Sequence, residues 1–431
     1  MPSQDLGPST PLHWRTGLSY GSLGLPLAFV SLPLYVNLPH YYAAVAGVPL
    51  ASLGAVLLAT RAIDAVLDPA LGRLADRLLH RGQRQAWLAA VLGSVIMVLG
   101  FAALWHPPLA VQEAALVWLA VSLLVCTLAY SAVSILHQAW GTRWGGDPHW
   151  RARVTAWREG ATLAGVLLAS ILPTWLGFDA TSIVLFLALA LGLLGLHSLQ
   201  RFTASPTRYG HRHIRPAQAA SPWADASFRR LLSVFMLNGV AAAIPATLLP
   251  FFVTDRLQAA DMQPLFLLCY FGAAAAGLPL WIKAVSRWGL APSWRAGMLA
   301  SIIAFSLTPW LDAGDGKVFI LICLASGLAL GADLALPGAL LTGVIHESGH
   351  GGSGEGRYLG WWACATKLNL ALAAGLCLPL LAFLGYHSGT TDPAGLQALA
   401  WTYGGLPCLF KLLAWACLWR AEHLHTSWRL I

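Results

Sequence analysis

The stretch Arg61-Ala-Ile-Asp64-Ala-Val-Leu-Asp68-Pro69 places three charged residues inside a hydrophobic segment, residues 48–70, that is long enough to cross a membrane. Residues i and i+4 share a helix face, and i+3 lies beside them, so Arg61, Asp64 and Asp68 form one polar stripe. A charged group in the bilayer interior costs at least roughly 2.5–3.5 kcal/mol on insertion scales. The stripe therefore predicts a cation or proton site in a transporter.

The composition of the whole chain also indicates lipid. Of 431 residues, 57% are hydrophobic and only 10% are charged, whereas a soluble domain carries about 25% charged residues. The net charge of +8 forms no compact patch, so no nucleic-acid partner is expected. The seven cysteines all fall in hydrophobic segments and form no CxxC pair, which favours simple packing roles. The first fourteen residues are polar and Pro-rich, so no cleavable signal peptide is expected.

Hydrophobic windows of about 20 residues predict an all-α membrane protein with twelve transmembrane helices. The expected spans are 17–38, 48–70, 86–105, 111–139, 155–176, 180–199, 229–253, 263–284, 294–311, 317–344, 358–384 and 396–419.

Basic residues gather in the loops that follow even-numbered spans, while the loops after odd-numbered spans are nearly free of them. This alternation places the even loops and both termini in the cytoplasm. One long polar, Pro-containing segment, residues 200–228, separates six spans from six. We therefore expect an N-terminal bundle over 1–199, a cytoplasmic linker over 200–228, and a C-terminal bundle over 229–431.

Several motifs resemble a known family. Gly72-Arg73-Leu74-Ala75-Asp76-Arg77 resembles the loop signature of the major facilitator superfamily. The preceding Arg61-x-x-Asp64-Ala-x-x-Asp68-Pro-x-x-Gly72 resembles the second-helix motif of the glycoside–pentoside–hexuronide:cation symporters, the melibiose permease family. The similarity continues through Tyr130 to Gly141, then Asp147, Arg151 and Arg158, and through Arg357-x-x-Gly360-x-Trp362 with Lys367-Leu368. The family fold consists of two six-helix bundles, the major facilitator fold.

The resemblance assigns roles to individual residues. The family carboxylates similar to Asp64 and Asp68 bind the coupling Na⁺, Li⁺ or H⁺, with a fourth-helix hydroxyl, here Ser131, helping to coordinate the cation. The lysine similar to Lys367 lies near that site, and the arginine similar to Arg158 lies at the sugar site. Chemistry agrees, because two close carboxylates in a low dielectric cannot both stay ionised without a proton or a metal ion. The alternative is a structural salt bridge with Arg61.

The chain also departs from the melibiose permease pattern. The asparagine between the two family aspartates is Leu67 here, and the loss of an oxygen ligand favours H⁺ over Na⁺. The two sugar-binding aspartates would fall near Pro26 and Ser134, and the sugar-stacking tryptophan aligns with Gln138. The cation-binding half of the pattern is therefore kept and the melibiose-type sugar half is not, so melibiose is not the expected substrate.

Other candidates for solute contact come from single polar residues in apolar spans. Asp333 is a lone acid in the tenth span, so it could contact substrate or a proton, or it could simply pack within the protein. Ser134, His137 and Gln138 lie in the fourth span and are candidate substrate contacts, although His137 could equally be a satisfied core histidine, and Asn238 is similar. Trp362 could stack on a solute. Gly72, Asp76 and Arg77 are predicted to form a conformational loop that pairs with cytoplasmic helix ends in one state.

These observations predict a secondary active transporter in the bacterial inner membrane, a monomer that couples H⁺ or Na⁺ to a sugar, glycoside or similar polyhydroxylated solute. No other cofactor is expected, and no enzyme fingerprint appears in a suitable context. One alternative is transport of a lysolipid or other amphiphile, since the missing acids leave a more apolar cavity. A second alternative is a membrane sensor or scaffold that moves no solute.

Overall fold

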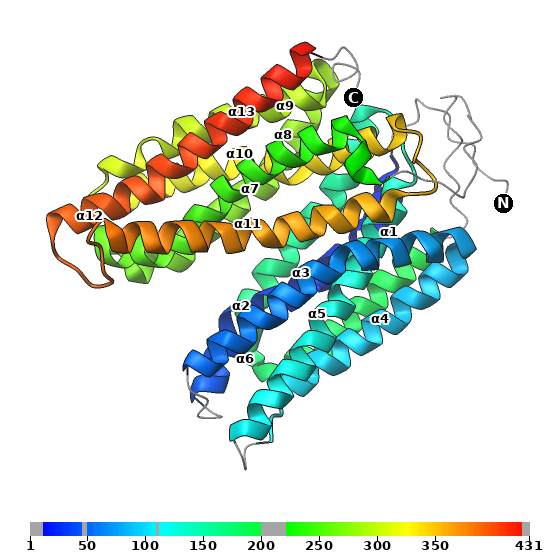
Figure 1. Cartoon of the computed structure of the whole chain (residues 1–431), viewed down its shortest axis with the longest axis horizontal. Helices are drawn as coiled ribbons and strands as arrows, with labels where there is room; N and C mark the ends of the chain where they lie inside the picture. The colour runs from blue at the N-terminus through cyan, green and yellow to red at the C-terminus, as the bar shows by residue number, and fades with distance from the viewer. Residues whose placement is uncertain (1–11, 45–49, 109–111, 200–220, 425–431) are drawn as a thin grey trace. The chain divides into compact units, whose positions relative to one another are not determined.

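The computed structural model describes residues 12–44, 50–108, 112–199 and 221–424, and every regular element in these ranges is helical (Figure 1). The all-α class is therefore confirmed. The main helices are α1 (Trp14–Gly21), α2 (Gly24–Ala44), α3 (Leu50–Arg81), α4 (Gln83–Leu104), α5 (Gln112–Thr142), α6 (Pro148–Ser198), α7 (Ala226–Phe251), α8 (Gln263–Trp288), α9 (Leu290–Phe305), α10 (Gly316–Glu347), α11 (Glu355–Phe383), α12 (Pro393–Ala400) and α13 (Leu406–Leu424).

Eight helical stretches in the described ranges are long and apolar enough to cross a membrane. They are Gln83–Leu104, Ala114–Thr142, Leu176–Ser198, Ala226–Arg256, Ala260–Trp288, Leu290–Trp310, Gly316–Glu347 and Glu355–Phe383. Their outward faces carry large apolar side chains, of which Phe383 is 88% exposed and Leu191 68% exposed. In water such a surface would be unstable, so these faces are suited to the hydrocarbon core of a bilayer.

The chain divides into two compact units. Unit 1 consists of Met1–Ala220 together with Ile345–Cys364, and unit 2 consists of Ser221–Val344 together with Ala365–Ile431. In unit 1, α2 packs along α6, and α5 packs against both α3 and α4. In unit 2, α13 packs against α7 and α9. The segment Ile345–Cys364, which contains the connection between α10 and α11, therefore packs with helices that precede it by more than 200 residues.

Helix α3 continues beyond the expected span and includes the motif that the sequence placed in a loop. Gly72, Ala75, Asp76 and Leu79 are buried, with the spacing of one helix face. The helix ends only at Arg81, since Gly82 has φ 124°, a backbone conformation that favours glycine. The expectation of a loop after residue 70 was wrong because the stretch is rich in good helix formers.

Helix α6 runs through two expected spans, with a break where the sequence expected one. Its N-terminus is capped by Asp147, whose carboxylate accepts a hydrogen bond from the amide of Trp150 at 2.7 Å. Inside the helix, Gly177 has φ 76° and ψ 171° and interrupts the helical geometry. The two halves of α6 therefore match the expected spans 155–176 and 180–199.

A cluster of aromatic side chains lies within the core of unit 2. Two π-helical turns, Phe252–Arg256 and Trp401–Gly405, bring Phe252 and Tyr403 together in a stacked pair, with 4.1 Å between ring centroids. Phe319 completes the cluster and lies edge-on to Phe266, at 4.8 Å between centroids. Such aromatic packing fixes the positions of α7, α8, α10 and α13 around one interior space.

Candidate functional site

The acidic pair of α3 lies on the buried face of the helix. Asp64 is 5% exposed and Asp68 is fully buried, whereas Arg61 is exposed. The hydroxyl of Ser131, on α5, donates a hydrogen bond to a carboxylate oxygen of Asp64 at 3.0 Å. The structure thus brings together three of the residues expected at a cation site, and they supply only oxygen atoms, which are the ligands that hard cations prefer.

A small cavity adjoins Asp64 in unit 1. Its volume is about 30 Å³, and it is lined by Val30, Leu34, Leu57, Thr60, Arg61, Asp64, Leu123, Thr127 and Tyr130. This volume exceeds the 10–15 Å³ or so that one water molecule needs. Water or a small ion could therefore reach the carboxylate without displacing a side chain. No cluster of three or more histidine, cysteine or acidic side chains suited to a transition metal occurs among the described residues.

The start of α11 crosses α3 beside the acidic pair, at positions that require glycine. A side-chain carbon on Gly360 would lie 2.5 Å from the backbone oxygen of Asp68, and one on Gly356 would clash with the backbone oxygen of Gly72. The two helices therefore approach backbone to backbone. Any movement of the first turns of α11 would therefore change the packing around the Asp68 backbone.

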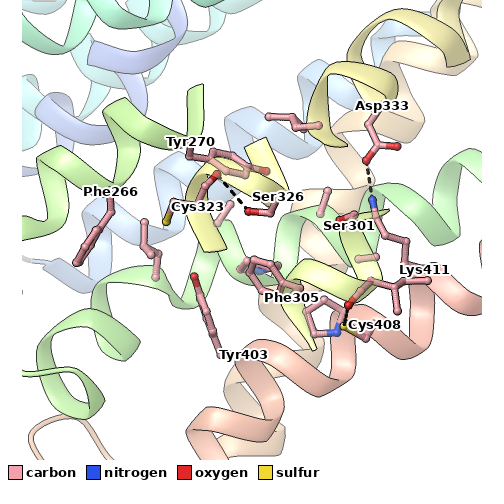
Figure 2. A pocket seen from close by; sticks show the side chains of 18 of the residues that line it. Phe266, Tyr270, Ser301, Phe305, Cys323, Ser326, Asp333, Tyr403, Cys408 and Lys411 are labelled. Carbon is pink, nitrogen blue, oxygen red and sulfur yellow. Dashed lines mark hydrogen bonds and ion pairs between the residues drawn. The ribbon is translucent and has the colours of Figure 1, made fainter. Parts of the chain in front are cut away.

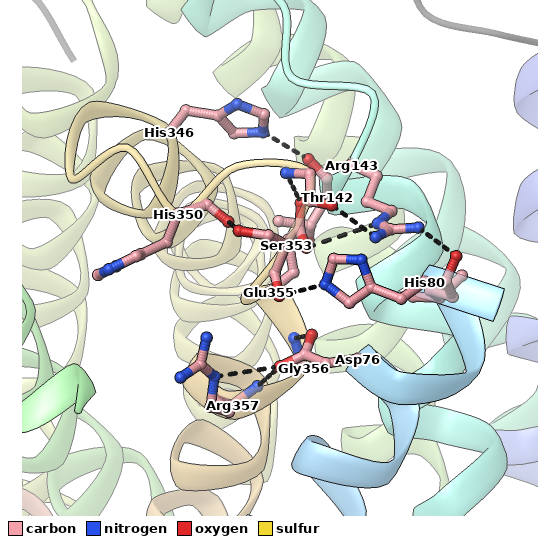
Figure 3. Close-up of polar contacts among 12 residues, drawn as sticks. Asp76, His80, Thr142, Arg143, His346, His350, Ser353, Glu355, Gly356 and Arg357 are labelled. Atoms are coloured by element: carbon pink, nitrogen blue, oxygen red, sulfur yellow. Dashed lines mark hydrogen bonds and ion pairs between the residues drawn. The ribbon is translucent and has the colours of Figure 1, made fainter. Parts of the chain in front are cut away.

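Asp76 anchors the same crossing through charge. Its carboxylate accepts hydrogen bonds from the amides of Gly356 at 2.6 Å and Arg357 at 3.1 Å, and it lies 3.4 Å from the Arg357 guanidinium (Figure 3). The free amides of a helix N-terminus favour a negative charge in this position. Burial nevertheless raises the pKa of Asp76 to about 6, against the lowering effect of these amides.

Two further residues hold the segment Ile345–Cys364 on unit 1, and the sequence did not single them out. Arg143 donates to the backbone oxygens of Leu79 at 2.9 Å and Gly352 at 2.6 Å, and lies 3.6 Å from the Glu355 carboxylate. His80 contacts the backbone oxygen of Ser353 at 2.9 Å (Figure 3).

Of the predicted conformational residues, Gly72 and Asp76 thus lie in this contact. Arg77 instead lies on the exposed face of α3.

The solute candidates of unit 1 make polar contacts within that unit. Arg158 and Glu159 form an ion pair of 2.6 Å with both side chains 16% exposed. His137 is buried, and its Nε2 contacts the backbone oxygen of Tyr20 at 2.8 Å, while its Nδ1 has no hydrogen-bond partner among the described residues. The remaining candidates are Gln138, which donates to the Ser134 hydroxyl at 3.2 Å, and Trp362, which is 8% exposed.

Asp333 is the centre of a polar cluster inside unit 2. The Lys411 ammonium donates to one of its carboxylate oxygens at 2.6 Å (Figure 2). The other oxygen accepts from the Trp294 indole at 2.8 Å and from the Asn238 amide at 3.1 Å. Lys411 also donates to the Asn238 side-chain oxygen at 3.0 Å. We did not single out Lys411 from the sequence, although a charged residue in the middle of the last hydrophobic span indicates a functional or structural partner.

Lys367, the predicted partner of the acidic pair, belongs to unit 2 and is half-buried there. Asp64 and Asp68 belong to unit 1. The pairing of Lys367 with the acidic pair therefore stays a prediction.

Solved structures of similar fold are membrane transporters. An outward-facing bacterial homologue of the iron transporter ferroportin matches with a TM-score of 0.69 at 15% identity, over 96% of this chain and 100% of that one. The proton:xylose symporter XylE matches with a TM-score of 0.64 at 17% identity, over 94% of each chain. At these identities the likeness shows the fold alone.

Sequence relatives point the same way. The inner membrane symporter YicJ of Escherichia coli is 24% identical over 313 residues, which cover 68% of this chain and 65% of that protein. The glucuronide carrier protein homolog of the same organism is 25% identical over 95% of this chain and 92% of that protein. The putative glycoside/cation symporter YagG, also from E. coli, is 29% identical over 37% of this chain and 35% of that protein.

A family model described as MFS/sugar transport protein matches residues 19–422, nearly the full chain. The expected resemblance to glycoside:cation symporters is confirmed, and the family consists of transporters rather than enzymes. The chain is an integral membrane protein that belongs to the MFS/sugar transport protein family.

Proposed function

We propose that this protein is a secondary active transporter that couples the movement of H⁺ or Na⁺ to the uptake of a sugar, glycoside or similar small polyhydroxylated solute. The named activities of its relatives support this function. The observation that carries it is the buried pair Asp64 and Asp68, with the Ser131 hydroxyl at 3.0 Å from Asp64 and a small cavity beside it. No relative named here carries lipids, so the lysolipid alternative is not favoured.

The proposed architecture is the complete major facilitator fold, with twelve transmembrane helices in two six-helix bundles over 1–199 and 229–431. The polar segment 200–228 would be a cytoplasmic linker, with both termini in the cytoplasm. The excess of basic residues in even loops supports this orientation. In a bacterial inner membrane the protein would act as a monomer, with no cofactor besides its coupling ion.

The coupling ion would bind between the carboxylates of Asp64 and Asp68, with Ser131 as an additional oxygen ligand and Lys367 as the charge partner. Two acids that share a buried helix face repel each other, and a proton or Na⁺ relieves that repulsion. Binding thus changes the net charge of the site. Loaded and empty forms would then favour different conformations, which is the requirement for coupling.

The release of Ile345–Cys364 from α3 would accompany that change. Asp76 holds the first amides of α11, and Gly360 packs on the backbone of Asp68, so the segment contacts α3 both at the acidic pair and about two turns beyond it. Arg158, Ser134, His137, Gln138, Asp333 and Trp362 remain the proposed solute contacts. Among them, Gln138 and Ser134 expose paired polar groups on one face of α5.

Transport into membrane vesicles tests the proposal. Vesicles containing the wild-type protein receive an imposed pH or Na⁺ gradient and a panel of radiolabelled glycosides, hexuronides and pentosides. We expect accumulation of at least one solute above its equilibrium level. Asp64→Asn and Asp68→Asn should abolish accumulation, because an amide cannot exchange a proton or balance the charge of Na⁺.

The matched control is Asp179→Asn, which changes an exposed aspartate whose side chain is 80% accessible and lies 3.3 Å from His106. This variant should accumulate solute as the wild type does. Wild-type accumulation by both Asp64→Asn and Asp68→Asn would overturn the proposed coupling site.

A further inference from the structure

Unit 2 contains a cavity that is separate from the proposed cation site. Its volume is about 120 Å³. Its walls come from α7, α8, α9, α10, the π-helical turn Trp401–Gly405 and α13. Phe266, Tyr270 and Tyr403 lie towards one end, and Asp333 with Lys411 lies at the other (Figure 2). A dry engineered cavity of about 150 Å³ is known to hold benzene. The space therefore suits one aromatic ring.

The polar end of the cavity offers a hydrogen-bond donor but no net charge. Lys411 and Asp333 neutralise each other at 2.6 Å. An ammonium group carries three N–H donors. Among the described residues, Lys411 gives two of them, to Asp333 and Asn238, which leaves one for a ligand. An oxygen acceptor would be held there, whereas an anion would lose its hydration without gaining an unpaired counter-charge.

The remaining walls favour an aromatic ring over a sugar. Apolar side chains make up most of the lining, and its hydroxyl groups are those of Tyr270, Ser301, Ser326 and Tyr403. The Ser326 hydroxyl already donates to the backbone oxygen of Ile322 at 2.6 Å. A sugar carries more hydroxyl groups than this lining can pair, at a cost for each unpaired one. A ligand with a single oxygen avoids that cost.

Small residues mark the opening of this cavity. Ala242 and Ala246 lie one turn apart on α7, and both are exposed although they line the space. The deeper Phe266 and Phe319 are each only 1% exposed. A flat ring could therefore enter past two methyl groups without repacking the core.

We infer that this cavity binds an uncharged single-ring aromatic alcohol, with its ring among the aromatic side chains and its oxygen accepting a hydrogen bond from Lys411. Phenol is the simplest such ligand. Binding is a property of unit 2, and it requires neither coupling at Asp64 and Asp68 nor transport of any solute.

Equilibrium dialysis of the purified full-length protein in detergent tests the site, with radiolabelled phenol, benzene and benzoate as probes. We expect the wild type to bind phenol at one site per chain. Ala246→Phe fills the opening and should weaken phenol and benzene binding by at least about tenfold, the loss expected when a ring no longer reaches its pocket. Unchanged binding in Ala246→Phe would overturn the proposal.

The matched control is Ala275→Phe, which changes an exposed alanine of α8 that does not line the cavity. It adds the same ring and the same affinity for detergent, so it should bind phenol as the wild type does. Equal loss in Ala246→Phe and Ala275→Phe would show that the effect does not depend on the cavity, and would overturn the proposal.

The polar contact is tested with the double variant Asp333→Asn/Lys411→Met, which removes both charges together. It should keep its affinity for benzene and lose the preference for phenol, a change of about tenfold for one hydrogen bond to a charged donor. Benzoate should bind more weakly than phenol to the wild type. Tighter binding of benzoate than phenol, or an unchanged phenol preference in the double variant, would contradict the assigned contact.

Discussion

The two units hold buried carboxylates in opposite ways. In unit 2, Asp333 receives hydrogen bonds from an ammonium, an indole and an amide, so its charge is balanced by a fixed partner inside the same unit. In unit 1, Asp64 and Asp68 lie one turn apart on one helix face, with a hydroxyl at 3.0 Å and a cavity beside Asp64. The charge of Asp333 thus has a fixed partner, whereas the cavity beside Asp64 has room for water or a small ion.

The surroundings of the two sites differ in the same sense. Asp333 is surrounded by helices of its own unit. The acidic pair lies instead where the backbone of α11 crosses α3, at Gly360 and Asp68, and where Asp76 holds the helix start. A site whose charge changes is useful only beside an element that can respond. By this comparison, the acidic pair lies beside a helix contact that can respond to a change of charge, whereas Asp333 is held within unit 2 by Lys411.

Removing the ammonium from unit 2 should give the largest loss of stability. Lys411→Met leaves Asp333 buried without its cation, which typically costs about 3–5 kcal/mol. The thermal unfolding midpoint of the purified protein should therefore fall sharply. The double variant Asp333→Asn/Lys411→Met should recover most of that loss.

For the acidic pair, we expect a substitution to cause no loss of thermal stability, in contrast to Lys411→Met in unit 2. Asp68→Asn removes one of two repelling acids and should leave the thermal midpoint near or above that of the wild type. A large drop for Asp68→Asn, together with none for Lys411→Met, would reverse the roles assigned to the two sites.

A larger side chain at the close contact between α3 and α11 should have an intermediate effect on stability. Gly72→Leu places a side chain against the Gly356 backbone, so we expect a destabilisation of about 1–3 kcal/mol and weaker attachment of Ile345–Cys364. Gly54→Leu is the control, because it lies on the same helix with no atom within 4 Å of an added carbon. Equal unfolding midpoints for the two variants would show that α11 does not depend on this contact.

The contact of Asp76 should give the smallest effect, visible as a dependence on pH. Burial raises its pKa from 3.8 to about 6, so Asp76 binds a proton more tightly in the folded protein than in the unfolded chain. Its contribution to stability is full below about pH 3.8 and falls as the pH rises through 6. We expect a fall of roughly 1–2 kcal/mol across this window.

Asp76→Asn should remove that dependence, measured as the thermal midpoint between pH 4 and 7.5. Asp179→Asn should retain it, because the Asp179 side chain is 80% accessible. A wild-type pH profile in Asp76→Asn would assign the effect to another group.

Sequence periodicity predicted the parts of the site that depend on one helix. The i, i+4 spacing placed Asp64 and Asp68 on one face, and the structure buries that face. The family resemblance supplied Ser131, which the structure places at 3.0 Å from Asp64. The loop expected after residue 70 was wrong because the hydrophobic window ends there, whereas α3 continues and buries Asp76 on the same helical face.

Pairings between distant helices were beyond the reach of periodicity. Asp333 and Lys411 are 78 residues apart, and nothing in either span specifies the partner. The same holds for Arg143 and Gly352, which are 209 residues apart. Packing decides such contacts, because each buried polar group takes whichever partner the fold brings within reach.

Electrical recording from supported membranes tests most directly whether the acidic pair carries an exchangeable charge. A transported glycoside is added to proteoliposomes, and the current is compared with solute exchange in the same preparation. The wild type should give a transient inward current, and Asp68→Asn should give none while still exchanging labelled for unlabelled glycoside. A current of wild-type size in Asp68→Asn would contradict the coupling role of the acidic pair.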